Sequence, residues 1–324
     1  MNRSAFRSRD VATAIAAGLC VIAAAATALG WGISAHRMIT SEAIGLLPGE
    51  MQAFFRANSQ NLAALSIEPD ALSEESREEA PNHFMDLDAF DKPPFDKIPL
   101  DEKAFVRKFG KDALKEGRLP WAIGDRYRML VDAMRERDGE GVLRNAGYVA
   151  HYVADATMPL HATKNYKGQL TGNVIFEGNA ADRHVHVRFE VGMIDANLDD
   201  IRKRMEAEVG SVREIKDPAG EAFALLKDSY SHIEPVLAAD GELVKPGSLV
   251  EPRYYTEMYR RVGGLAVQRM ALARSQVASY WASAWIEAGR PELGGVAVVL
   301  KEPALVPKAA LPAMAPQGSL EGQK

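Results

Sequence analysis

Three polar side chains in a long apolar stretch have the residue types and the spacing of a metal site. His151, Asp155 and His161 stand in the pattern His-x3-Asp-x5-His. The first two are one helical turn apart, so an imidazole and a carboxylate project from the same face of a helix. Pro159 ends that helix, and His161 follows in the next turn. Charged groups on so apolar a helix are costly without a partner, and a metal ion is the natural compensation.

The alternative for any one of these histidines is a buried ring that bonds to a carbonyl group. Two imidazoles and a carboxylate in one short stretch favour the metal site. A second pair, His186 and Glu190, repeats the one-turn spacing of nitrogen and carboxylate, which again suits a divalent ion. Asp70 and His83 lie upstream in polar segments, and taken alone they would mean little.

The order of these motifs, with Trp31-Gly32 followed by His36, resembles the zinc-dependent phospholipase C and P-one/S-one nuclease superfamily. The resemblance runs from Trp31 to about Glu190. It implies an all-α, single-domain helical bundle with a cleft for three zinc ions. The implied ligands are Asp70, His83, His151 and Asp155 for the first ion, His161, His186 and Glu190 for the second, and for the third His36, the shared Asp155 and the amino group and carbonyl of Trp31.

The chemistry of these residue types agrees with what the resemblance implies. A zinc ion that lacks one protein ligand keeps a water molecule whose pKa falls towards neutrality. Two ions about 3.5–4 Å apart can share that water as hydroxide, which attacks a phosphodiester in line. Asp70 is in addition the candidate catalytic base. His184 and His232 are left over, and we expect them to be surface or supporting residues.

Two enzyme branches remain open for the substrate, and of the two we favour the nuclease and 3′-nucleotidase over the phospholipase C. The short Trp-x4-His spacing, the Gly172-Asn173 pair and the segment from Phe176 to Gly178 favour the nuclease and 3′-nucleotidase branch, whose endonucleases act on single-stranded nucleic acid. That branch would require aromatic side chains on which bases stack. The candidates are Phe90, Phe95 and Tyr166, unless they simply pack beneath the loops.

Other features depart from the nuclease branch. Glu190 as the last ligand resembles the bacterial phospholipases C, which act on phospholipid head groups. Ser73 stands where such a nuclease often has Arg, and the cysteines of the fungal nucleases are missing after residue 30. A further alternative is a zinc-binding protein without activity. That alternative predicts a missing ligand, and the sequence has them all.

Helical patterns dominate the elements that must position these residues. They cover residues 36–47, 50–65, 101–116, 121–138, 141–157, 217–238 and 251–288. The segment 141–158 is apolar around most of its circumference, which places it at the centre of a bundle. The polar loops 66–100 and 162–183 are too long to be mere connections, so we expect them to carry function.

The chain divides into three parts. Residues 1–30 have the basic start, the apolar run and the small-residue ending of a signal peptide, although the run would also suit a membrane anchor. We therefore expect a periplasmic or secreted enzyme, with its phosphoesterase domain in residues 31–290. Residues 291–324 are rich in Pro and Ala and predict a disordered tail.

The charge of the chain constrains how a substrate is bound. Removing three arginines and one aspartate with residues 1–30 changes the net charge from −5 to −7. Such a chain has no general attraction for nucleic acid or anionic lipid, so a phosphodiester of either kind must be held locally. No stable protein partner is implied. Cys20 lies in the first part, so disulfide bonds cannot stabilise the rest.

Overall fold

The computed structural model describes residues 31–176, 183–246, 250–295 and 297–308. The predicted signal peptide and the last part of the predicted tail lie outside these residues. Within them the chain is helical, with one isolated antiparallel bridge between Met85 and Gly117 and no strand. None of the helices in these ranges combines the length and the apolar character needed to span a membrane. The predicted all-α, single-domain fold class is confirmed.

Thirteen α-helices are described, together with several shorter turns of helix. The α-helices are α1 Ile33–Ala43, α2 Gly49–Ala57, α3 Ser59–Leu65, α4 Glu68–Glu75, α5 Glu102–Phe109, α6 Leu119–Glu136, α7 Gly139–Ala156, α8 Val185–Val187, α9 Ile194–Ala196, α10 Leu198–Ala207, α11 Pro218–Tyr230, α12 Ile233–Leu243 and α13 Pro252–Glu287. The 3₁₀ turns are η1 Ile44–Leu46, η2 Ala80–His83, η3 Leu87–Ala89, η4 Lys111–Glu116 and η5 Pro159–Ala162, and η6 Arg188–Met193 is a π-helix.

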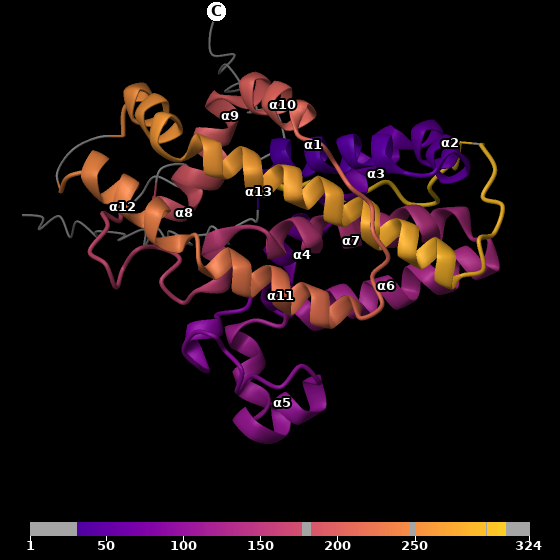
Figure 1. Ribbon diagram of the computed structural model, residues 1–324, viewed down its shortest axis with the longest axis horizontal. Helices are drawn as coiled ribbons and strands as arrows, with labels where there is room; N and C mark the ends of the chain where they lie inside the picture. Colours follow the sequence, from indigo (N-terminus) through magenta and orange to yellow (C-terminus); the bar gives the residue numbers. More distant parts are fainter. Residues whose placement is uncertain (1–30, 177–182, 247–249, 296, 309–324) are drawn as a thin grey trace, which may run out of the picture.

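Helix α7 occupies the centre of the bundle, as its sequence predicts. Buried residues lie on nearly all of its sides, and it packs against α1, α3, α6, α11 and α13. Arg137, in the left-handed conformation at φ 56°, ends α6 and lets α7 fold back along it. The long α13 crosses the bundle, while α5 projects from one side (Figure 1). The motif residues on α7 are thereby enclosed.

A glycine lets α3 approach α7 closely. A Cβ atom at Gly147 would lie only 2.8 Å from the Leu65 Cβ atom and 2.9 Å from the Leu65 carbonyl carbon. Any side chain here would push the two helices apart. Ser66 follows Leu65, and His151 follows Gly147 by one helical turn. The same close approach therefore brings the Ser66 backbone to the His151 ring.

Some predicted helices are shorter or divided. The predicted helix 50–65 is broken at Asn58, whose side-chain amide donates to the Phe54 carbonyl oxygen at 2.9 Å and so competes with the helix. The predicted helix 217–238 divides into α11 and α12. The predicted helix 101–116 stops at Gly110, where φ is +86°, and continues as η4.

The polar regions hold more helix than the sequence predicts. Helix α4 lies within the predicted loop 66–100, and α8, η6, α9 and α10 occupy a region without a predicted helix. Helices α4, α8 and η6 are short, and the polar residues that they bury obscure their apolar periodicity.

Residues 297–308, here named the C-terminal strap, run extended over α3 and α4. The sequence predicts disorder from residue 291, but the backbone of the strap pairs with side chains of the bundle. Val298 N donates to Asn58 Oδ1 at 2.6 Å, and Leu305 N donates to Glu68 Oε1 at 3.1 Å. These acceptors hold the segment in place together with apolar contacts, because Val298, Leu300 and Ala304 pack against the core. Residues 309–324 of the predicted tail lie outside the described residues.

Candidate metal centre

Eight of the nine predicted ligand residues bring their side chains together in three adjoining buried clusters. Each of these side chains belongs to a residue that is at most 3% exposed. The first cluster is Asp70, His83 and His151 with Asp155, the second is His161, His186 and Glu190, and the third is His36, His151 and Asp155. Segments more than a hundred residues apart in sequence thus meet beside α7.

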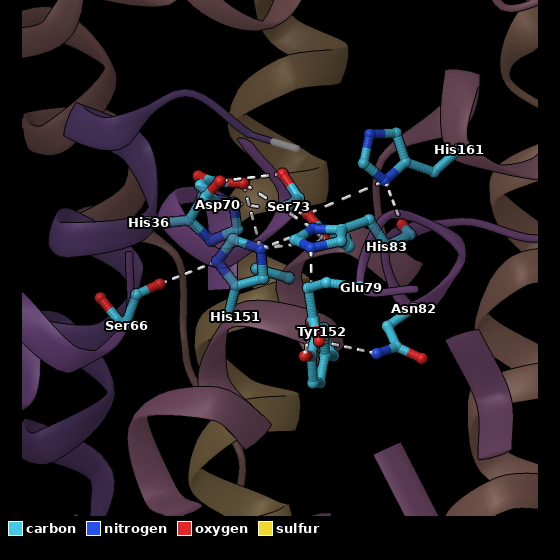
Figure 2. A network of polar contacts seen from close by, with 12 residues as sticks. His36, Ser66, Asp70, Ser73, Glu79, Asn82, His83, His151, Tyr152 and His161 are labelled. Carbon is cyan, nitrogen blue, oxygen red and sulfur yellow. Dashed lines mark hydrogen bonds and ion pairs between the residues drawn. The ribbon is translucent and has the colours of Figure 1, made fainter. Parts of the chain in front are cut away.

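The first cluster has the spacing of a tetrahedral zinc site. His151 Nε2 lies 3.0 Å from His83 Nδ1, and both nitrogens lie 3.2 Å from Asp155 Oδ2. Asp70 Oδ1 lies 3.5 Å from the first nitrogen and 3.7 Å from the second. Ligand atoms about 2.0–2.1 Å from a tetrahedral ion are about 3.3 Å from one another. Figure 2 shows Asp70, His83 and His151 turned towards one another.

Hydrogen bonds on the far side of two rings select the nitrogens that face the first and second clusters. His151 Nδ1 donates to the Ser66 carbonyl oxygen at 2.8 Å, so Nε2 carries the lone pair. His161 Nδ1 likewise donates to the His83 carbonyl oxygen at 2.6 Å, which leaves its Nε2 as the ligand atom. Both rings therefore have the tautomer that a metal ion needs.

Glu79 is a supporting residue that the sequence interpretation did not include. Its Oε1 atom lies 3.7 Å from His83 Nε2, which favours a proton there and the lone pair on Nδ1. The Tyr152 hydroxyl donates to Oε1 and the Asn82 side-chain amide donates to Oε2, so the carboxylate is held in place (Figure 2). The sequence did contain a signal for Glu79, because this residue precedes His83 by one helical turn, the same spacing as that of His186 and Glu190.

The second cluster is built on a π-helix. His186 comes from α8 and Glu190 from η6, and His186 Nε2 lies 2.8 Å from Glu190 Oε2. His161 Nε2 lies 3.7 Å from the same oxygen. A π-helical turn holds an extra residue and is frequent at functional sites, because it changes the direction in which side chains project. Here it encloses the carboxylate beside two imidazoles.

The third cluster shares Asp155 with the first. His36 Nε2 lies 3.3 Å from Asp155 Oδ1, while Oδ2 of the same carboxylate faces the first cluster. The His36 ring stacks on the His151 ring, with centroids 3.9 Å apart. Asp155 is therefore placed to bridge two ions, as the resemblance implies.

Trp31, the ninth predicted ligand residue, begins the described chain beside the centre. Its side chain is fully buried and its indole Nε1 donates to Thr157 Oγ1 at 3.2 Å. Gly32 N donates to the Glu190 carbonyl oxygen at 3.4 Å, which holds this end of the chain against the π-helix. Ligation by the amino group and carbonyl of Trp31 stays a prediction.

Unsatisfied polar atoms show that the clusters fit metal ions. In the part of the chain that the structure describes, sixteen buried side-chain nitrogen and oxygen atoms lack a hydrogen-bond partner, and eleven of them belong to predicted ligands. Both carboxylate oxygens of Asp70 and of Glu190 are among them. Orphaned buried groups are costly and rare in folded proteins. Divalent cations would satisfy these atoms together.

Burial shifts the pKa values of the ligands in both directions. It lowers the pKa of His36 to about 3, helped by the neighbouring His151, so that imidazole is neutral at pH 7. Burial raises the pKa of Asp70 to about 6 and that of Glu190 well above its usual range. Although burial opposes it, the imidazoles of His151 and His161 hold the pKa of Asp155 well below its usual range. Bound cations would allow all three carboxylates to be ionised.

The candidate base-stacking aromatics have different locations. Phe95 is 2% exposed and packs against Tyr230. Phe90 packs against Phe105 and its neighbours on α5. Tyr166 alone reaches the centre, with its ring centroid 5.6 Å from that of His186.

The two left-over histidines lie outside the clusters. His184 is buried beside His186, with ring centroids 6.0 Å apart, and is thus a supporting residue. His232 is partly exposed, with Nε2 3.9 Å from Asp228 Oδ1. Both locations agree with the sequence interpretation. Ser73 does not face a substrate either, because its hydroxyl donates to the Asp70 carbonyl oxygen at 2.8 Å.

The Gly172-Asn173 pair serves the second cluster indirectly. The Asn173 side-chain amide donates to Asp240 Oδ2 at 2.8 Å, and the same carboxylate accepts two hydrogen bonds from Arg188, also at 2.8 Å. Arg188 lies between His186 and Glu190 in sequence, so this network holds the π-helix to α12. Sequence reasoning missed Arg188 and Asp240, which are far apart in the chain.

A cavity of about 850 Å³ lies next to Gly172 and Asn173. Its lining also includes Phe95, Tyr230 and Leu237, and none of its lining residues is a predicted ligand.

No protein-family model matches the chain, but it has likenesses to known proteins, of which two are described here. The first is to the alpha toxin from Clostridium absonum, at 14% identity and a TM-score of 0.49, over 83% of this chain and 66% of the toxin. The second is to a probable serine protease from Bradyrhizobium tropiciagri, 26% identical over 201 residues. That match covers 54% of this chain and only 24% of the protease.

Proposed function

We propose that the protein is an exported, zinc-dependent hydrolase of phosphate esters that uses three zinc ions. The approach of four ligand atoms in the first cluster carries the proposal. His151 Nε2 and His83 Nδ1 are 3.0 Å apart, and the hydrogen bond of His151 to Ser66 leaves its lone pair facing inwards. Carboxylate oxygens of Asp70 and Asp155 complete the set. A divalent cation is the simplest group that all four would bind at once.

When bound, zinc ions would polarise a phosphoryl oxygen and provide a nucleophile from water near neutral pH. Asp70 supports that chemistry from the protein side. Its Oδ1 atom faces the first cluster, and its Oδ2 atom is buried without a hydrogen-bond partner. This carboxylate could accept a proton from the attacking water at that oxygen. Its role as a base rests on this free oxygen.

For the substrate we favour a phospholipid head group over single-stranded nucleic acid. The nuclease interpretation requires stacking aromatics, but Phe90 and Phe95 pack within the protein and leave only Tyr166 beside the centre. Asn173, part of the nuclease-like pair, has its amide engaged by Asp240 and Leu237. Glu190 in the second cluster has the identity found in bacterial phospholipases C. These observations reverse the order of preference that the motif spacing alone favours.

A serine protease activity receives no support from the described residues. In those ranges no hydrogen bond joins a serine hydroxyl to a histidine ring, which a serine nucleophile and its base would require. The likeness to the probable protease covers 24% of that protein, whereas the name of the protease refers to the whole of it.

The test is to purify the chain that begins at Trp31 and assay it on phosphatidylcholine, on single-stranded DNA and on 3′-AMP. We expect close to three zinc ions per chain, hydrolysis of the lipid head group, and loss of activity with a chelator. Active protein with one zinc ion or none would refute the three-zinc proposal. Turnover of nucleotides without turnover of lipid would refute the choice of substrate.

A further inference from the structure

Helix α4 has an important ligand but a weak apolar anchor. It carries Asp70, and Ser66, the C-cap of α3 two residues before its start, supplies the carbonyl group that sets the His151 tautomer. Three of its five buried residues are polar, namely Glu68, Asp70 and Ser73. Apolar contact comes mainly from Ile67, just before the helix, and from the small Pro69 and Ala71. Polar contacts therefore help to determine where α4 lies.

The C-terminal strap supplies such contacts on both sides of Asp70. Leu305 N donates to Glu68 Oε1 at 3.1 Å, near the start of α4. Lys308 N donates to Glu74 Oε1 at 3.2 Å, near its end. Arg144 on α7 binds Glu68 Oε2 and also donates to the Glu302 carbonyl oxygen at 3.3 Å. Helix α4 is thus held between the central helix and the strap.

The strap also binds α3, before the Ser66 junction. Val298 N donates to Asn58 Oδ1 at 2.6 Å, and the Asn61 side-chain amide donates to the Val298 carbonyl oxygen at 2.9 Å. The segment after α13 returns past α2 and α3 in Figure 1. The strap therefore spans the junction that contains Ser66, with attachments on α3 and on α4.

Helical geometry separates the strap from the metal centre. Two residues of an α-helix correspond to about 200°, so Glu68 and Asp70 project to nearly opposite sides of α4. Glu68 faces the strap and Asp70 faces His83 and His151. Glu74, which binds Lys308, lies one helical turn from Asp70 on the same side of α4. No hydrogen bond or ion pair joins residues 297–308 to a predicted ligand among the described residues, so the strap acts on the centre through α4.

We propose that the C-terminal strap is a positioning element of the metal centre, which holds Asp70 and the Ser66 carbonyl group in the geometry that binds the first ion. The proposal rests on the proposed zinc-dependent function. The strap acts on the first cluster and not on the second, whose residues lie on η5, α8 and the π-helix and have no hydrogen bond to residues 297–308 among those described. Release of the strap loosens α4 and lowers the affinity of one ion out of three.

The test removes one hydrogen-bond donor from the strap of the full chain. Leu305→Pro deletes the N–H group that binds Glu68, while Leu305→Ala keeps that group and removes the same side chain. Val306→Pro is a second control, because it introduces a proline ring next to residue 305 but keeps the Leu305 N–H group. Zinc affinity is measured by competition with a chromogenic chelator, and zinc content by elemental analysis. Far-UV circular dichroism checks that each variant is folded.

We expect the ion of the first cluster in Leu305→Pro to bind about tenfold less tightly, the scale on which partners outside the ligand set act. Leu305→Ala and Val306→Pro should bind zinc as the unmodified chain does. The same tenfold loss should appear in a chain that also carries Glu190→Gln, because the affected ion is not the one beside Glu190.

Three results would overturn the proposal. Equal zinc affinity in Leu305→Pro and Leu305→Ala would mean that the strap does not position the metal centre. The proposed zinc-dependent function would be unaffected by that result. A loss that disappears in the Glu190→Gln background would place the effect at the second cluster. If the unmodified chain itself bound no zinc, the proposed function would fail together with the role of the strap.

Discussion

The first and second clusters use the same residue types but differ in how the protein supports them. In the first, His151 bonds to the Ser66 carbonyl group, and Glu79, itself held by Tyr152, faces His83. In the second, both ring nitrogens of His186 and both carboxylate oxygens of Glu190 are buried without a hydrogen bond. Only His161 there has a ring fixed from behind.

In the first cluster the fold itself orients the ligand side chains, whereas in the second a metal ion would have to orient most of them. A ligand whose ring is already oriented loses less freedom when it binds, so the first cluster should hold its ion more tightly. Asp70 in the first cluster and Glu190 in the second each have two unsatisfied oxygens, but in the second cluster His186 also lacks a hydrogen bond on either nitrogen, so its geometry should depend more on the ion. We expect stepwise removal of zinc by a chelator to start at the second cluster.

The strongest test of the comparison is His151→Ala. The substitution removes a ligand of the first cluster and leaves Asp155 as a buried charge. We expect loss of at least one zinc ion, a fall in phosphodiesterase activity of more than about 100-fold, and a free energy of unfolding lower by about 3–5 kcal/mol. Elemental analysis, activity assays and urea unfolding measure the three. His232→Ala is the control and should change none of them. Unchanged zinc content in His151→Ala would refute the assignment of the motif.

The next largest effect concerns the chain end at Trp31. A free amine can coordinate zinc when it is neutral, whereas a peptide nitrogen cannot, because its lone pair is delocalised. A chain with methionine retained before Trp31 should therefore hold about two zinc ions and have much reduced activity, while one that begins at Trp31 should hold three. Zinc counts on the two proteins, with N-terminal sequencing, make the measurement. Three ions and full activity in the extended chain would exclude the amine as a ligand.

Glu190→Gln tests the second cluster alone. We expect three zinc ions to fall to two.

The same substitution should stabilise the metal-free protein, because burial raises the pKa of Glu190 well above its usual range. A raised carboxyl pKa contributes stability below the ordinary value of about 4.3, and this contribution is lost as the pH rises. Gln has no proton to lose, so metal-free Glu190→Gln should gain stability relative to the unmodified chain between pH 4 and pH 8. Urea unfolding with a chelator present would show it, and a constant difference across that range would contradict a raised pKa of Glu190 as the cause.

The smallest expected effect is that of Glu79→Gln. The amide keeps the size of the side chain and its hydrogen bond with Tyr152 but loses the charge that favours a proton on His83 Nε2. Zinc affinity of the first cluster should fall about tenfold. Tyr152→Phe, which leaves the carboxylate in place, should have a smaller effect. An unchanged affinity in Glu79→Gln would mean that the Asp70 and His151 contacts alone orient His83.

The parts of the centre that the sequence predicts are those with local spacing. His151 and Asp155 lie on one helix, and so do their apolar neighbours, so one-turn spacing and periodicity locate both the ligands and α7. Helix α4 escapes prediction because its buried residues include Glu68, Asp70 and Ser73, whose polar character is typical of a loop. The strap and the Asn173–Asp240–Arg188 network also escape, since each joins residues whose only link is the fold.

Asp155 couples the first and third clusters thermodynamically. Its two oxygens face different clusters, so an ion that binds one oxygen fixes the carboxylate for the other and removes part of the ordering cost of the second binding event. The coupling is reciprocal, because either ion raises the affinity for its neighbour by the same factor. We therefore expect these two sites to fill cooperatively, with few chains that hold only one of the two ions. A zinc titration followed by native mass spectrometry should then show the pair arriving together and the ion of the second cluster arriving independently.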